Sequence, residues 1–120
     1  MIIYLPDKPI KKHTQLMKLA MEVNMQKVFF LVKYENKMCS LDGSNRLTAL
    51  KDMNIMPTFI ELKEDDYVLL SESSNILIAI KKDEINNFIK EYEEYQDFIK
   101  QVKEFLIFHK DNDFKNYIDF

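Results

Sequence analysis

The stretch that decides the fold is Ser40-Leu41-Asp42-Gly43-Ser44-Asn45-Arg46-Leu47-Thr48-Ala49-Leu50. An apolar strand pattern ends at Leu41, and the only glycine among the 120 residues follows at position 43. Beyond it, Arg46, Ala49, Leu50 and Met53 recur at the i, i+3, i+4, i+7 spacing of an amphipathic helix. The pattern therefore predicts a strand, a tight turn at Asp42-Gly43 and a helix over Ser44–Met53.

This strand–turn–helix junction is a candidate anion site. A glycine lets the backbone approach a ligand closely, and the first turn of a helix offers N–H groups and the positive end of its dipole. Arg46 lies in that turn, where a cation is disfavoured by about 0.3–1 kcal/mol. A bound phosphate would explain its position, and so would an ion pair with Asp42, Glu61 or Asp7. Ser44 likewise is either a phosphate ligand or an ordinary helix cap.

Periodic segments on both sides of the junction predict further helices and strands. Met1–Ile10 suits a strand or an extended arm, and Thr14 is expected to cap a helix that ends near Asn24. The run Lys27–Tyr34 reads as a strand buried on both faces. The other expected elements are a turn at Glu35-Asn36-Lys37 and strands at Met38–Leu41 and Thr58–Leu62. Asp65–Leu70 suits a helix or a strand, and Ile76–Ile80 suits a strand or the start of a helix.

The last third of the chain carries a heptad pattern after Asp83, an expected helix cap. Ile85, Tyr92, Ile99 and Leu106 share one heptad position, and Phe88, Tyr95, Val102 and His109 share another. A continuous helix from Glu84 to His109 would be about 39 Å long, which exceeds the width of a compact domain. We therefore expect a break near Asp97, packing across the domain, or a partner.

These patterns together predict an α+β fold, in which helices pack on a small mixed sheet. Residues 1–82 are expected to form the core. Residues 83–120 are expected to form a helical C-terminal extension that packs on the core or in a homodimer through residues 85–109.

The composition of the chain narrows the classes of function that it can have. A net charge of −3 disfavours a nucleic-acid partner, because phosphate backbones are bound by clustered Lys and Arg. Cys39, the single cysteine, is expected to be a buried apolar residue, and two histidines without ligand spacing indicate no metal site. Without an 18-residue apolar run or a signal pattern, we expect no membrane association and a cytoplasmic location. The clusters Glu61-x-x-Glu64-Asp65-Asp66 and Glu91-x-Glu93-Glu94 read as solvated faces.

Lys27–Leu62, with the junction at its centre, resembles the core of ParB-like and sulfiredoxin-like domains. Those families carry a strand, a Gly-x-x-Arg-x-x-Ala signature that opens a helix, and a following strand introduced by a proline-containing turn. Gly43, Arg46, Ala49, Leu50 and Pro57 fit that pattern, and with the preceding helix the resemblance covers about half of the chain. It implies a ParB/sulfiredoxin-like fold.

The resemblance also implies that Asp42, Gly43, Ser44, Asn45 and Arg46 bind a nucleotide or phosphate, with a nucleoside triphosphate and magnesium as the expected ligand. Hydrolysis or phosphotransfer would follow in some branches of the family, and whether this site is catalytic stays open. Ser44 stands where sulfiredoxins have their reactive cysteine, which argues against sulfinate reduction. The acidic C-terminal half lacks the basic DNA-binding domain of chromosome-partitioning proteins.

Two other functions stay open. One is a catalytically inactive interaction protein, of the bacterial or phage accessory type, that acts through its aromatic C-terminal helix. The other is a nucleic-acid-binding regulator.

Overall fold

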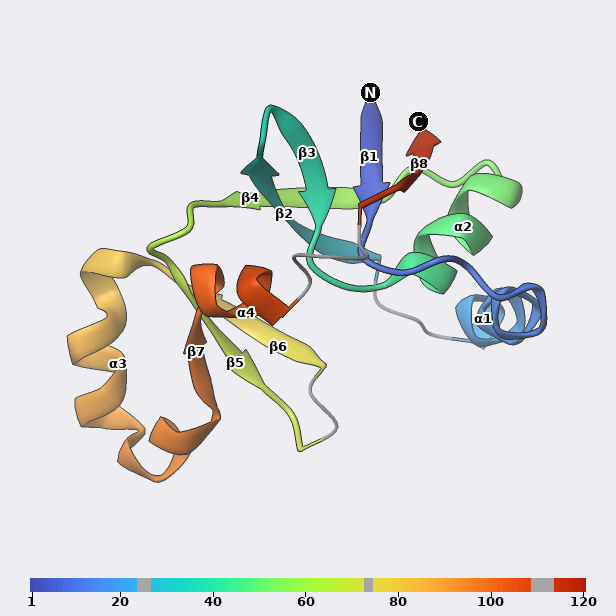
Figure 1. Cartoon of the computed structure of the whole chain (residues 1–120). Helices are drawn as coiled ribbons and strands as arrows, with labels where there is room; N and C mark the ends of the chain where they lie inside the picture. The colour runs from blue at the N-terminus through green and yellow to red at the C-terminus, as the bar shows by residue number, and fades with distance from the viewer. Residues whose placement is uncertain (24–26, 73–74, 109–113) are drawn as a thin grey trace. The chain divides into compact units, whose positions relative to one another are not determined.

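The computed structural model describes residues 1–23, 27–72, 75–108 and 114–120 (Figure 1). The chain forms two units: Met1–Glu61 together with Asp111–Phe120, and Leu62–Lys110. The second unit is therefore inserted in sequence between two parts of the first. This division differs from the expected boundary at residue 82, although the broad α+β class with a mixed sheet is confirmed.

The first unit is built on a five-stranded sheet in the order β4-β2-β3-β1-β8. β1 (Ile2–Leu5) pairs in parallel with β3 (Lys37–Ser40) and antiparallel with β8 (Asn116–Asp119). β2 (Val28–Tyr34) pairs antiparallel with β3, and β4 (Thr58–Leu62) lies next to β2. The strands predicted at Lys27–Tyr34, Met38–Leu41 and Thr58–Leu62 are therefore present, and they lie in one sheet.

The hairpin between β2 and β3 explains how the sequence turns here without glycine. Tyr34 and Lys37 pair across the strands, and the two residues between them, Glu35 and Asn36, have φ values of 50° and 62°. Both are in the left-handed region that the favoured two-residue hairpin turns require. The turn predicted at Glu35-Asn36-Lys37 is therefore confirmed.

The core of this unit lies between the sheet and α2 (Ser44–Asp52). Leu47 and Leu50 of α2 are fully buried against residues of β1 and β2, and Met53 packs at the edge of the same cluster. Four consecutive residues of β2, from Phe29 to Val32, are buried, as expected for a strand covered on both faces. α1 (Lys11–Val23) packs against α2.

The second unit has a three-stranded antiparallel sheet in the order β6-β5-β7. Its strands are β5 (Tyr67–Leu70), β6 (Ile76–Ile80) and β7 (Ile99–Gln101). Its helices are α3 (Ile85–Glu91), the 3-10 segments η1 (Lys82–Glu84) and η2 (Glu93–Phe98), and α4 (Val102–Phe108). Val68, Val102 and Leu106 are among its buried residues.

The expected helical extension over residues 83–120 is wrong. α3 ends at Glu91, the 3-10 segment η2 follows as far as Phe98, and Ile99–Gln101 is a strand because it pairs with β5. Residues Asn116–Asp119 form β8 in the first sheet. Ile85, Val102 and Leu106 are buried as expected, whereas Tyr92 and Tyr95 are exposed, and His109 lies outside the described residues.

Two predicted helix caps are also wrong. α1 begins at Lys11, so Thr14 lies inside the helix and its N–H donates to the Ile10 carbonyl oxygen at 2.9 Å. The side chain of Asp83 caps nothing, because the 3-10 turn η1 leads directly into α3. The predicted helix end at Asn24 lies outside the described residues. None of the described helices is long and apolar enough to cross a membrane.

Candidate functional site

Gly43 adopts the conformation for which a glycine is needed. It has φ 80° and ψ 30°, in the left-handed region, and it directly precedes α2. A Cβ at this position would lie 2.7 Å from Cε1 of Phe29 and 3.1 Å from Nη2 of Arg46. Both the backbone conformation and the space therefore demand glycine, and the predicted tight turn at Asp42-Gly43 is present.

Arg46 is held by two neighbours from different parts of the junction. Its guanidinium carbon lies 4.5 Å from the centre of the Phe29 ring, and its Nη2 lies 3.6 Å from Oδ1 of Asp42. The side chains of Arg46 and Asp42 are 22% and 20% exposed. Asp42, one of the three ion-pair partners considered from the sequence, is thus a partner of Arg46 in the structure. The guanidinium is thus fixed beside Gly43 and remains partly open to solvent.

Ser44 and Asn45 attach the segment between β1 and α1 to the first turn of α2. The backbone N–H of Asp7 donates to Ser44 Oγ at 3.1 Å, and the backbone N–H of Ile10 donates to Asn45 Oδ1 at 2.8 Å. Each side-chain oxygen therefore accepts a hydrogen bond from a residue far away in sequence. Ser44 does not cap its own helix, because the N-cap residue is Gly43.

The structure brings the five predicted residues, Asp42 to Arg46, together around the N-terminus of α2. The sequence interpretation missed Phe29, which forms one wall of the junction, and residues 7–10, which lie across it. Phe29 could have been suspected as a neighbour, since the strand at Lys27–Tyr34 was expected to be buried on both faces. The contacts of residues 7–10 are backbone contacts, which leave no signal in side-chain composition.

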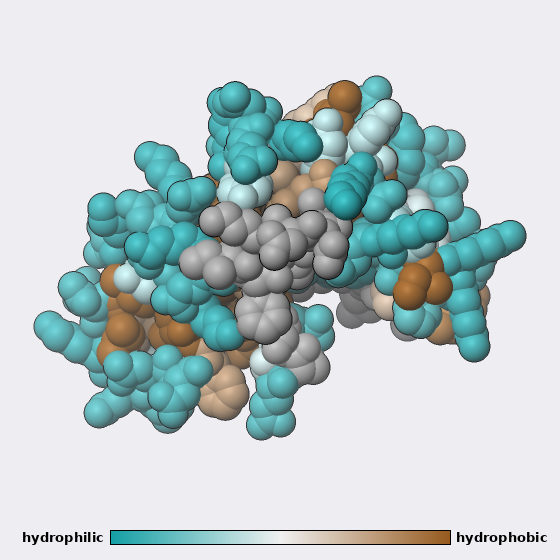
Figure 2. All heavy atoms as spheres, in the orientation of Figure 1, coloured by the Kyte–Doolittle hydropathy of each residue, from teal (hydrophilic) through white to brown (hydrophobic). Residues whose placement is uncertain are grey.

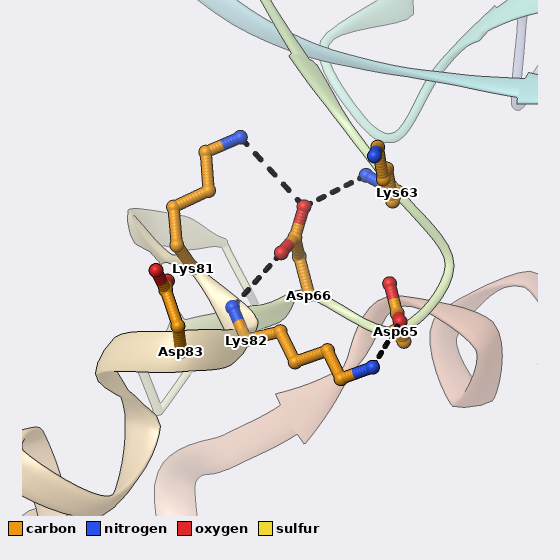
Figure 3. A pocket seen from close by; sticks show the side chains of 6 residues that line it. All are labelled: Lys63, Asp65, Asp66, Lys81, Lys82 and Asp83. Carbon is orange, nitrogen blue, oxygen red and sulfur yellow. Dashed lines mark hydrogen bonds and ion pairs between the residues drawn. The ribbon is translucent and has the colours of Figure 1, made fainter.

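A charged hollow of about 470 Å³ lies in the second unit (Figure 3). Its lining consists of Lys63, Asp65, Asp66, Lys81, Lys82 and Asp83. Asp66 is at its base, 4% exposed, and its carboxylate accepts the backbone N–H groups of Lys63 at 2.8 Å and Lys82 at 2.9 Å. The interpretation of Asp66 as a solvated residue is therefore wrong, because it ties the β4–β5 turn to the start of η1.

The other charges of this hollow are largely paired with one another. Lys81 lies 3.7 Å from Asp66, and Lys82 lies 3.0 Å from Asp65. The hydrogen bond from Lys82 holds the pKa of Asp65 below its ordinary value, and the same contact raises the pKa of Lys82. Three ammonium groups and three carboxylates balance, so the lining favours neither an anion nor a cation. Among the described residues, no group of His, Cys, Asp and Glu side chains is arranged to hold a metal ion.

Cys39 is fully buried in β3, as predicted. Burial raises the pKa of its thiol to about 11. A thiol in this state is a poor nucleophile, because the thiolate is the reactive form.

Residues Glu91–Phe98, which we call the acidic aromatic surface, form an exposed stretch of the second unit. All eight side chains are exposed, and the segment carries four carboxylates and no basic residue. Tyr92 packs against Phe88 of α3 and against Tyr95, with ring centroids 4.9 and 6.4 Å apart. Tyr92, Tyr95 and Phe98 are 39%, 45% and 38% exposed. The space-filling view shows apolar atoms among hydrophilic ones over α3 and its surroundings (Figure 2).

Comparisons with known proteins found no matching family model, no matching curated protein and no matching solved structure.

Proposed function

We propose that this chain is a ParB-like domain that binds a nucleotide through its phosphate groups at Asp42–Arg46. The observation that carries the proposal is the position of Arg46. Its guanidinium lies in the first turn of the nine-residue helix α2, beside Gly43, and part of it faces solvent. Helix N-termini and arginine side chains are both preferred ligands of phosphate groups.

The fixed position of Arg46 would favour phosphate binding in addition to its ion pair with Asp42. A guanidinium that already lies on Phe29 and beside Asp42 loses little side-chain freedom when it contacts a ligand. A phosphate over the turn would meet the partly exposed guanidinium and the positive end of the α2 dipole. The absence of a Cβ at Gly43 allows Phe29 and Arg46 to pack this closely against the turn.

The carboxylate of Asp42 limits how much negative charge a ligand can carry at this site. Its carboxylate lies 3.6 Å from the guanidinium and repels a bare anion. A magnesium-bound nucleotide reduces this repulsion, because the cation offsets part of the phosphate charge. We therefore expect magnesium to strengthen binding. Asp42 is also the carboxylate beside the guanidinium that would bind the phosphate. Hydrolysis or phosphotransfer would each be detected as conversion of the nucleoside triphosphate to the diphosphate.

The test is a thermal-shift series with nucleoside triphosphates, with and without magnesium. A ligand that binds only the native state adds about 2.7 kcal/mol at 100 times its dissociation constant, which raises the melting temperature by several degrees. At least one magnesium nucleotide should produce this shift. If none does, the proposal is wrong and the junction is a structural turn.

The Arg46→Ala variant should weaken binding of that nucleotide by about 1.5–3 kcal/mol, the contribution of a charge-assisted contact. Arg46→Lys keeps a charge beside Asp42 but loses the planar fork, so its binding should also weaken while its stability changes less. Lys51→Ala is the matched control, because Lys51 is an exposed cation at the other end of the same helix. Equal affinity of Arg46→Ala and Lys51→Ala, both folded, would contradict the assigned role.

A further inference from the structure

A second exposed surface of the molecule has the opposite charge to the acidic aromatic surface. It consists of Lys8, Ile10, Lys11, Lys12, Leu16 and Leu19, which we call the basic leucine surface. Residues 8–19 contain four lysines and no acidic residue. Only Lys18 of the four is paired among the described residues, at 3.2 Å from Asp52.

The apolar part of this surface is well exposed. Lys12, Leu16 and Leu19 follow one another at i, i+4 and i+7, so they share one face of α1. Leu16 and Leu19 are 53% and 62% exposed, and Ile10, just before the helix, is 53% exposed. The space-filling view shows this apolar patch bordered by hydrophilic atoms over α1 (Figure 2). Leucines on an exposed helical face beside unpaired ammonium groups are typical of a surface that meets a partner.

We propose that the basic leucine surface of one copy of this chain binds the acidic aromatic surface of a second copy. The two surfaces have opposite charges, and both expose apolar side chains. One has three lysines and three aliphatic side chains, and the other has four carboxylates and three aromatic side chains. Among the described residues, none of those three lysines or four carboxylates has an ion-pair partner within its own chain.

The helix dipole favours the same contact. Lys11 and Lys12 occupy the first turn of α1, which contains no acidic residue. A cation there is unfavourable, and an incoming carboxylate neutralises both the ammonium group and the helix terminus. Tyrosine and phenylalanine are the side chains enriched at protein interfaces, and leucines complement their rings by apolar contact. Because the contact joins two different surfaces, two copies can exchange a pair of identical contacts, or more copies can associate in series.

The experiment compares the full-length protein with two charge-reversed variants by sedimentation velocity over a concentration series. The first variant is Lys11→Glu/Lys12→Glu, and the second is Glu93→Lys/Glu94→Lys. The wild type should exceed the monomer mass in low salt and return toward it in 1 M salt, where the screening length falls from about 10 Å to about 3 Å. Each variant alone should stay monomeric at the concentrations at which the wild type associates.

Mixing the two variants supplies the decisive result. In the mixture, the now acidic α1 of the first variant can bind the now basic η2 of the second. The unchanged acidic η2 of the first variant can likewise bind the unchanged basic α1 of the second. Association should therefore return, and it should return in a single chain that carries all four substitutions. Melting temperatures check folding, and the first variant should keep its helix because glutamate suits the first turn. A monomeric wild type, or a mixture that stays monomeric while both variants are folded, would overturn the proposal.

The nucleotide proposal is tested separately, because neither variant changes residues 42–46. A failure of self-association therefore leaves the thermal-shift result unaffected, and the reverse is also true.

Discussion

Replacing Gly43 with alanine should destabilise the protein by two separable effects. A left-handed backbone conformation costs an L-residue about 1–2 kcal/mol, and Gly43 has φ 80°. The added methyl group would lie 2.7 Å from Cε1 of Phe29, which is fully buried and has little room to move. Overlap of this kind costs about 1–3 kcal/mol in a packed core. The expected loss is therefore about 2–5 kcal/mol, a large part of the stability of an ordinary domain.

Urea unfolding followed by circular dichroism measures this loss, and Asn54→Ala provides the control. Asn54 also has a positive φ, 56°, but its side chain is exposed, so only the conformational cost of about 1 kcal/mol should appear. A Phe29→Leu background removes the Cε1 atom. Gly43→Ala should then cost about 1–3 kcal/mol less than in the wild type, as expected for residues in contact. A loss below 1 kcal/mol, or equal losses in both backgrounds, would refute the close packing of Gly43 against Phe29.

Three further predictions concern other parts of the chain. Asp66→Ala should lower the free energy of unfolding by about 2–5 kcal/mol, because two backbone N–H groups lose their acceptor. Asp65→Ala should cost much less, because Asp65 forms a solvent-screened ion pair with Lys82, and urea melts of the two variants give the comparison. Burial raises the pKa of the Cys39 thiol to about 11, so the thiol ionises first in the unfolded chain. As the pH rises from about 9 toward 11, the stability of the wild type should therefore fall more steeply than that of Cys39→Ala. Glu35→Asn should raise the free energy of unfolding by about 0.5–1 kcal/mol, because asparagine adopts the left-handed turn conformation more readily, and an unchanged denaturation midpoint would contradict this.

Local signals were sufficient to predict much of the first unit. The single glycine marked the junction, because a chain that is poor in glycine keeps it where the backbone conformation demands one. The apolar run Val28–Val32 indicated a buried strand, and Glu35-Asn36 indicated a turn. In each of these cases the sequence neighbours themselves determine the conformation.

The second unit shows where local reasoning stops. The spacing of Ile85, Tyr92, Ile99 and Leu106 satisfies a heptad, yet hydrogen bonds from β5 make Ile99–Gln101 a strand. This pairing joins residues about thirty positions apart in sequence, and periodicity within one segment contains no information about it. Asp66 was misread for a similar reason, since its burial depends on N–H groups that the fold supplies from two separate turns.

The candidate site was predictable in its residues but not in its contacts. The sequence named Asp42–Arg46 and included Asp42 among three possible partners of Arg46. The ring of Phe29 and the segment at residues 7–10 complete the junction, and both depend on the assembled sheet.

The order of strands in the first unit affects how the protein folds. β8 closes the sheet beside β1, so Ile2 pairs with Asp119 across almost the full length of the chain. During synthesis, the edge of β1 that receives β8 remains unpaired until the whole inserted unit, Leu62–Lys110, has been made. Contacts of such long sequence separation form slowly, because the ends of a long loop must first be brought together. The time during which this strand edge is open is the period in which the nascent protein is most prone to pair with other chains.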